Sequence, residues 1–272
     1  MVHISVNRVR IIIWVMFAGS PAGAQWMQHR AADVPRLPDG RPNSKASAPR
    51  AANGKPDLSG IWLDEENRPC PPYNCDDMLT PQEFWDVGWS LKGGLPYQPW
   101  AAALVKQRGE ARGQDDPTSH CLPGGPVKLH TDPLYRKIVQ TPGLVVILNE
   151  RNAMYRQIFT DGRSLPQDPQ PSWNGYSIGR WDGDVLVVTT IGFRDGIWLD
   201  RKGSPLTEAA TVTERFRRVE YGRLEIAMTV DDPKAYTMPW SVTVHQNLKP
   251  DTELIDYICL ENEKDMRHLV AK

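Results

Sequence analysis

The sequence predicts a mainly β fold, an antiparallel β-barrel or sandwich with a few peripheral helices. From residue 135 onward, short β-rich runs are separated by turn sequences, of which Asp182-Gly183-Asp184 is the clearest hairpin signal. Apolar and polar residues alternate along these runs, for example Leu224 and Ile226 against Glu225. Such alternation buries one face of a sheet and leaves the other in water, which is typical of antiparallel sheets. The 24 prolines and 21 glycines fit a chain with many turns between strands.

The expected strands follow one another mostly as hairpin partners. They are Gly60–Trp62, Tyr135–Gln140, Leu144–Glu150, Ala153–Thr160, Tyr176–Trp181, Val185–Thr190, Thr211–Val219, Arg223–Val230, Trp240–Leu248 and Glu253–Leu260.

Three short helices are expected beside the sheet. Thr80-Pro81-Gln82-Glu83 predicts a helix start, because Thr is a good N-cap, Pro suits the first helical position and Glu the third. Pro99–Arg112 predicts a second helix, and Glu261–Val270 a short helix that closes the chain. The Pro- and Gly-rich segment Asp115–Pro133 is expected to be a loop.

The first 24 residues have the three-part layout of a secretory signal peptide. A basic leader is followed by the apolar run Ile11–Ala18 and by the cleavage sequence Ala22-Gly23-Ala24. The apolar run is shorter than the roughly 20 residues that span a bilayer, so we expect cleavage rather than a membrane anchor. The mature protein is therefore expected in the periplasm or outside the cell. Residues 25–55 are expected to form a disordered tail, and residues 56–272 a single β-rich domain.

Four cysteines, Cys70, Cys75, Cys121 and Cys259, suggest two disulfides in such an oxidising compartment. The short spacing of Cys70 and Cys75 favours a local staple, which would leave Cys121 to pair with Cys259. One alternative is a zinc site, although a second close pair of ligands is missing. Another is a nucleophilic Cys121, although its neighbour His120 would point to the opposite face of an extended chain.

The charge balance and the motif content exclude several function classes. A formal net charge of −1 argues against nucleic-acid binding, which requires a basic face. The sequence contains no cofactor signature, and we expect no cofactor. The loop that carries His120 and His130 also holds Asp115, Asp116 and Asp132, which are ligands that divalent ions accept. The simpler interpretation is a solvated polar loop, so no metal site is predicted.

Glu214 is the first candidate for chemistry. It shares strand parity with Val212 and Phe216, so it faces inward if they do. A buried carboxylate needs a partner or takes a raised pKa, and Arg156 or Arg180 could pair with it. The residue is then either a brace inside the fold or a catalytic group.

An aromatic-walled polar pocket is the second candidate. The segment Phe193–Asp200 mixes aromatic residues with carboxylates in a long loop, a common place for ligand gating. The expected ligand-binding residues are Trp173, Arg180, Trp198, Arg156 and Trp62. A solvated turn without a ligand is the alternative.

A catalytic version of this pocket would use carboxylates and a tyrosine. Asp195, Asp200 or Glu208 could act as a general base beside or instead of Glu214, and Tyr176 as the acid. The expected catalytic residues are Glu214, Asp195 and Tyr176.

Several segments resemble a large family of exported bacterial proteins whose members have no assigned reaction. They are Cys121–Pro126, Lys137–Gly143, Tyr155–Arg163, Gly179–Asp184 and Asp232–Tyr236. The resemblance implies that Cys121 and Cys259 belong to a paired disulfide framework. Relatives often carry histidines near Tyr176 and Ser204–Leu206, and this chain lacks them there. Separately, Gly60-x-Trp62 is similar to the entry motif of lipocalins, so a calycin-like barrel is expected.

Two functions follow. The first is a periplasmic or secreted protein that binds a hydrophobic or aromatic small molecule in a β-barrel cavity, with no nucleic acid and no membrane span after cleavage. The alternative is a cofactor-independent lyase, hydratase or isomerase that acts on a small organic substrate through a carboxylate and a tyrosine. Barrel folds host both functions, so the fold cannot decide between them.

Overall fold

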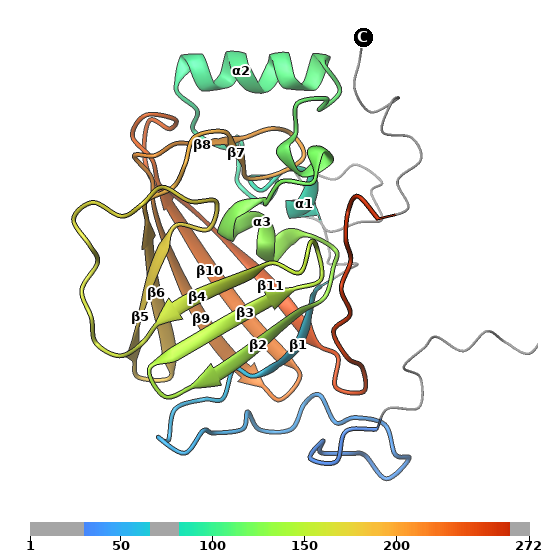
Figure 1. The fold of residues 1–272 in the computed structure, drawn as a ribbon. Coiled ribbons are helices and arrows are strands. Elements are labelled where there is room, and N and C mark those ends of the chain that lie inside the picture. Colours follow the sequence, from blue (N-terminus) through green and yellow to red (C-terminus); the bar gives the residue numbers. More distant parts are fainter. Residues whose placement is uncertain (1–29, 66–81, 262–272) are drawn as a thin grey trace, which may run out of the picture.

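The alternating strands close into a β-barrel, as Figure 1 shows for a computed structural model that describes residues 30–65 and 82–261. Nine strands of the described chain follow one another around the barrel in the order β1-β11-β10-β9-β6-β5-β4-β3-β2. Their bounds are β1 (Gly60–Asp64), β2 (Arg136–Thr141), β3 (Leu144–Asn149), β4 (Tyr155–Phe159), β5 (Tyr176–Asp182), β6 (Val185–Ile191), β9 (Thr211–Glu220), β10 (Arg223–Asp231) and β11 (Trp240–Leu248). The short strands β7 (Ile197–Trp198) and β8 (Pro205–Leu206) pair outside the barrel. The predicted fold class, a mainly β barrel or sandwich with a few peripheral helices, is confirmed in its barrel form, and the closed barrel is consistent with the calycin-like expectation.

The odd number of strands forces one irregular joint. Strand direction cannot alternate all the way round a closed ring of nine, so at least one neighbouring pair must be parallel. That pair is β4 and β5, joined by only two residue pairs, Ile158 with Ser177 and Phe159 with Ile178. A parallel pair also requires a long crossover connection, here residues 160–175. The β4–β5 joint is hereafter called the seam.

The lumen of the barrel is filled by its own side chains. Inward-facing residues from Trp62 on β1 to Val244 on β11 have essentially no exposed surface, which leaves no room for water beside them. The residues with 0% exposure are Trp62, Ile147, Ile158, Leu186, Val188, Thr190, Val212, Glu214, Leu224, Met228, Val230, Val244 and Gln246. Among the described residues, core side chains therefore fill the space where we expected a cavity inside the barrel.

Three helices and the β7–β8 pair gather at one end of the barrel, which we call the helical end (Figure 1). They are α1 (Gln82–Trp85), α2 (Pro99–Glu110) and α3 (Gly125–Thr131). The second expected helix is thus confirmed with its start at Pro99, while Thr80 lies outside the described residues. No helix of the described chain is long and apolar enough to cross a membrane.

Helix α3 is the main departure from the sequence prediction, because Asp115–Pro133 was expected to be a loop. Every residue of α3 is buried, and the helix plugs the helical end. The Gly and Pro residues that suggested a loop lie at its start, where Gly124 is the N-cap and Pro126 lies in the first turn, positions that tolerate both. Arg136 from the lumen caps the other end by donating to the carbonyls of His130 at 2.5 Å and Asp132 at 2.6 Å.

The opposite end is closed by Trp62. Its indole N–H donates to the carbonyl of Leu58 at 3.0 Å, and the guanidinium of Arg218 lies 5.0 Å from the centre of the ring. Arg218 also donates to the carbonyls of Asp57 and Tyr221. The similarity of Gly60-x-Trp62 to a barrel entry motif thus has a physical counterpart: an indole that seals one end of the core.

Residues 30–55 are not the disordered tail that we expected. They run beneath this closed end, where Figure 1 shows them in blue. Arg36 forms a bidentate ion pair with Asp251, and Arg50 forms one with Asp184. The backbone of Ala46 accepts a hydrogen bond from Tyr221. The segment has too little apolar surface for a core of its own, but its charged and backbone groups find partners on the barrel.

The strand expected at Glu253–Leu260 does not form. The segment runs outside the barrel and pairs with it only through an isolated bridge between Tyr257 and Arg151, among the described residues. It is held instead by the Cys121–Cys259 disulfide. The signal peptide, the Cys70–Cys75 pair and the helix expected from Glu261 to Val270 lie outside the described residues, apart from Glu261 itself.

The backbone at the entry to β5 gives a first prediction. Gly175 has φ +63°, and a Cβ there would lie 2.7 Å from the carbonyl oxygen of Ile191 and 2.7 Å from Thr190 Cγ2. Gly183 has a similar φ of +58° but open space around it. We expect Gly175→Ala to lower the free energy of unfolding by about 3 kcal/mol or more, since it adds a clash to left-handed strain. Gly183→Ala, the control, should lose only about 1–2 kcal/mol. Urea denaturation measures both, and equal losses would contradict the packing described at the seam.

Candidate functional site

Glu214 lies inside the barrel, fully buried, as the strand alternation predicted. Arg156 Nη1 donates to its Oε1 at 2.9 Å, and Arg156 Nη2 pairs with its Oε2. His130 of α3 places Nε2 2.8 Å from Oε1. The partner is thus Arg156, whereas Arg180 is exposed on the outer face of β5. Of the two readings of Glu214, the geometry is that of a brace.

Electrostatics fix the charges in this cluster. Burial raises the pKa of Glu214, but the charge and hydrogen bonds of Arg156 and the hydrogen bond of His130 outweigh burial and bring its pKa down to about 2. Burial lowers the pKa of His130, which is therefore neutral at pH 7. Because a carboxylate can only accept, the proton of the imidazole sits on Nε2, and Nδ1 has no hydrogen-bond partner among the described residues.

The same arginine ties the seam together from within. Arg156 on β4 donates to Ser177 Oγ on β5 at 3.2 Å and to Thr190 Oγ1 on β6 at 2.9 Å. Ser177 and Thr190 are themselves 2.9 Å apart. Side chains therefore join β4 to β5, β6 and β9 at the place where backbone pairing is weakest. This network places the two strands whose outer faces form the pocket described next.

A pocket of about 550 Å³ lies along the outside of the seam. We call it the seam pocket. Its wall is made of residues from the loop before α3, from the β3–β4 turn, from β4, from the crossover and from the start of β5. They are Pro123, Asn152, Ala153, Met154, Tyr155, Arg156, Gln157, Phe159, Ser172, Trp173, Asn174, Gly175, Tyr176 and Ser177. Its size is in the range of small-molecule sites, and three of the predicted site residues, Arg156, Trp173 and Tyr176, contribute to it.

Strand alternation explains the aromatic character of this wall. Along β4, Arg156 and Ile158 face the core, so Tyr155, Gln157 and Phe159 face outward. The rings of Phe159 and Tyr176 lie 5.4 Å apart across the seam. Tyr155 is 63% exposed, so its ring is accessible at the pocket. The pocket thus combines apolar rings with amide groups.

Two guanidinium groups stack on the pocket's rings. Arg163 lies 3.8 Å from the centre of Phe159 and donates to the Tyr176 hydroxyl at 3.2 Å. Arg194 lies 4.5 Å from the centre of Trp173. These contacts hold the rings in place, because each arginine packs against an otherwise solvated aromatic face.

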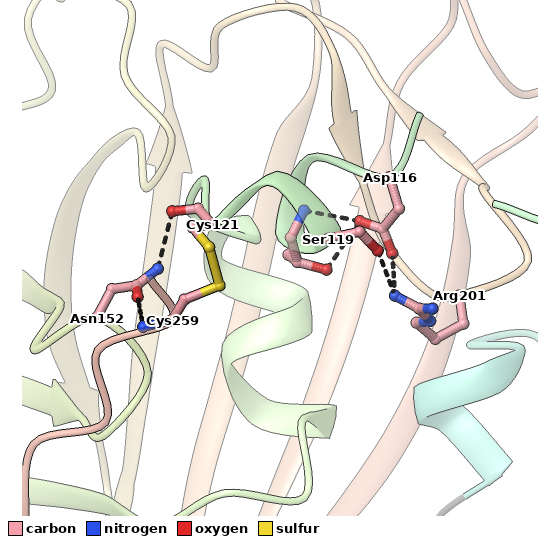
Figure 2. The surroundings of a disulfide bond; sticks show 7 residues. Asp116, Ser119, Cys121, Asn152, Arg201 and Cys259 are labelled. Carbon is pink, nitrogen blue, oxygen red and sulfur yellow. Dashed lines mark hydrogen bonds and ion pairs between the residues drawn. A yellow bond between two sulfur atoms is a disulfide. The ribbon is translucent and has the colours of Figure 1, made fainter. Parts of the chain in front are cut away.

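The Cys121–Cys259 disulfide lies beside Asn152, as Figure 2 shows. Asn152 belongs to the edge of the seam pocket that we call the rim. Cys121 and Cys259 are bonded, which confirms that pair. Between them Asn152, a residue of the pocket wall, donates through Nδ2 to the carbonyl of Cys121 at 2.8 Å and accepts from the backbone N–H of Cys259 at 2.9 Å. A nucleophilic role for Cys121 is excluded by its bond to Cys259. The loop that carries the cysteine is anchored further along by Asp116, which pairs with Arg201 at 2.7 Å and with buried Lys128.

Other predicted ligand-binding residues lie elsewhere. Trp62 is in the core, and Arg180 is exposed on the wall. Trp198 is buried in β7 under the guanidinium of Arg108. The sequence prediction rested on the aromatic content of the chain. In the structure, the alternation of side chains along the strands and the course of the loops place these residues outside the seam pocket.

The three expected catalytic residues are not brought together. Glu214 faces the lumen from β9, whereas Tyr176 lies in the wall of the seam pocket and its hydroxyl bonds Arg163. Asp195 is exposed beside Glu208, which pairs with Lys234. Asp200 is buried and accepts hydrogen bonds from Val87, Gly203 and Ser204. No carboxylate among these therefore pairs with Tyr176 as an acid–base couple.

The His and Asp side chains that we considered as metal ligands each contact other groups of the protein. His120 Nε2 lies 2.8 Å from the carbonyl of Gln114, and Asp132 pairs with Arg151 at 2.9 Å. Asp116 is held by Lys128 and Arg201. Within residues 30–65 and 82–261, no group of three or more His, Cys, Asp or Glu side chains is placed to hold a metal ion.

The sequence analysis missed the outward-facing side of β4. Tyr155, Gln157 and Phe159 form a polar-aromatic stripe on the wet face of a strand, and that alternation was itself readable. The sequence could not show that β4 pairs with β5 in parallel. The crossover that such a pair requires brings Trp173 and Asn174 to the wall of the seam pocket.

Comparison of the chain with family models, with curated proteins and with solved structures gave no significant match.

The buried brace gives a second prediction. Glu214→Gln removes the charge that compensates Arg156 and leaves a guanidinium buried without a counter-ion. We expect the free energy of unfolding to fall by about 3–5 kcal/mol. The control is Glu225→Gln on the neighbouring strand, whose carboxylate lies 3.5 Å from Arg217 on the outside of the barrel. It should change stability by about 1 kcal/mol or less. Similar losses in the two variants would show that the lumen pair is no brace.

His130 gives a pH prediction. Its pKa is lowered in the folded state, so the unfolded chain binds the proton more readily, and stability must fall as the pH drops below about 6.5. His130→Gln keeps a neutral N–H donor toward Glu214 and does not titrate. We expect the wild type to lose more stability than this variant between pH 7 and pH 5, measured by urea denaturation at each pH. Parallel pH profiles would mean that His130 does not titrate with a lowered pKa.

Proposed function

We propose that the protein, exported to the periplasm or beyond, binds a small aromatic molecule in the seam pocket. The observation that carries the proposal is the wall itself, where Tyr155, Phe159, Trp173 and Tyr176 surround about 550 Å³ together with amide side chains. Apolar walls with a few polar groups are the usual composition of small-molecule sites. The ligand would stack on the rings and take its orientation from Gln157 and the other amides.

The packing of the site supports binding over turnover. Arg163 and Arg194 hold two of the rings, and the Asn152 clamp at the disulfide holds the rim. Preorganised side chains lose little freedom when a ligand arrives, which raises affinity. The charged pair beneath the wall, Arg156 with Glu214, is buried and satisfied, so it stabilises the site rather than reacting. The disulfide also supports an oxidising compartment.

The test uses 2-naphthol, a neutral aromatic probe, with binding followed by calorimetry on the mature protein. We expect saturable binding that Phe159→Ala weakens by about tenfold or more, because the substitution removes one ring of the wall. Trp100→Ala is the control, since Trp100 is also exposed but lies on α2 and bonds the carbonyl of Lys234. It should leave the affinity unchanged.

Two results would count against the proposal. One is the absence of saturable binding of 2-naphthol. The other is equal weakening by Phe159→Ala and Trp100→Ala, which would indicate nonspecific adsorption to exposed aromatic groups. Native mass spectrometry of the protein purified from a periplasm adds an independent readout, because a retained aromatic ligand should be lost from the Phe159→Ala variant.

A further inference from the structure

A second pocket is lined by residues of α2, of the turn that follows it and of the segment that carries β7. These elements lie at the helical end (Figure 1). We call this second pocket the α2 pocket. It encloses about 380 Å³ and is lined by Leu104, Gln107, Arg108, Ala111, Asp115, Pro117, Trp173, Gly196 and Trp198. It shares only Trp173 with the seam pocket. Its floor is apolar, and its polar groups come from α2 and the turn that follows.

Arg108 is the distinctive group of this pocket. Its guanidinium lies 4.3 Å from the centre of the Trp198 ring, and Nη1 donates to the carbonyl of Gly203 at 2.6 Å. Within the described chain this is the one hydrogen bond of its side chain, and the carboxylates of Asp115, Asp116 and Asp200 act on it from beyond hydrogen-bond distance. Arg108 is partly buried, and that burial lowers its pKa. The stacking and the single hydrogen bond fix the plane of the guanidinium and leave its other N–H groups available.

A fixed, partly desolvated and unpaired guanidinium favours an anion. Removing a charge from water is costly unless an opposite charge compensates it, and a planar guanidinium fork matches a carboxylate bidentately. The apolar floor of Leu104, Trp173 and Trp198 suits a ring attached to that carboxylate. Asp115, which also lines the pocket, opposes an anion and should limit its affinity.

We propose that the α2 pocket is a second binding site, selective for an aromatic carboxylate whose ring lies on the apolar floor and whose carboxylate pairs with Arg108. This site does not depend on binding in the seam pocket. Arg108 is the residue that sets its specificity, and Asp115 tunes the affinity in the opposite direction.

The experiment compares indole-3-acetate with its neutral amide, indole-3-acetamide, by calorimetry on the mature protein. The acid should bind at least about tenfold more tightly than the amide, the effect expected of one charge-assisted hydrogen-bonded pair. Arg108→Gln should remove that preference, and Asp115→Asn should strengthen binding of the acid. Arg108→Lys keeps the charge without the planar fork, so it should retain only part of the preference. If Arg108→Gln does not fold, Arg108→Lys tests the proposal in its place.

Two controls separate this site from its surroundings. Lys106→Gln removes a positive charge from the same helix, where the ammonium is solvent-exposed and 3.7 Å from Glu110, and it should leave binding unchanged. Phe159→Ala alters only the seam pocket and should also leave binding of the acid unchanged. The proposal is overturned by equal affinities for acid and amide, by no saturable binding of the acid, or by loss of binding in Phe159→Ala but not in the Arg108 variants.

Discussion

The ion pair between Arg156 and Glu214 is the constraint on which the rest of the structure depends. A ring of nine strands must contain a parallel joint, and here that joint has only two backbone pairs. Arg156 closes it from inside by reaching Ser177, Thr190 and Glu214 on the next strands. A buried pair of this kind is weak evidence of net stabilisation, because desolvation offsets much of the attraction. Its value lies in fixing which strands meet at the seam.

The placement of the candidate site follows from that joint. A parallel pair needs a crossover, and residues 160–175 supply it by passing over the outside of the wall. The crossover carries Trp173 and Asn174 to the outward face of β4, and the seam pocket lies between them. Since the lumen is filled by the core, this fold cannot hold a ligand in the manner of a hollow barrel. The binding surfaces that we propose are instead formed where loops pass over the wall or over the helical end.

The sequence predicted the barrel well because its evidence was local. Alternation of apolar and polar residues assigned the inward faces, including that of Glu214, and turn sequences placed most hairpins. The sequence prediction was wrong where tertiary contacts determine the conformation of a segment or the burial of a side chain. The glycines and proline at the start of α3 looked like a loop until burial at the helical end made a helix favourable. The segment 253–260 is largely apolar and follows a turn, as a hairpin strand would, but every strand edge of the closed barrel is already paired. Trp62 looked like a ligand-binding aromatic residue, and only the fold shows that it is buried in the core. Trp198 was expected beside Trp173 in one pocket, and only the fold places it under Arg108 at the helical end.

The buried polar groups form a connected path rather than isolated exceptions. Glu214 is hydrogen-bonded to His130 of α3, and Arg136 caps the same helix. Lys128, also on α3, forms an ion pair with Asp116. Asp116 in turn holds Arg201 beside β7 and β8. Apolar side chains of similar size would fill the space, but they would not fix the rotation of a seven-residue helix within the barrel end. Because α3 follows Cys121 directly along the chain, fixing the helix also fixes the loop that the disulfide joins to the pocket rim. The core and the proposed binding surfaces therefore share one set of polar contacts. A substitution in the lumen should alter the position of the rim of the seam pocket.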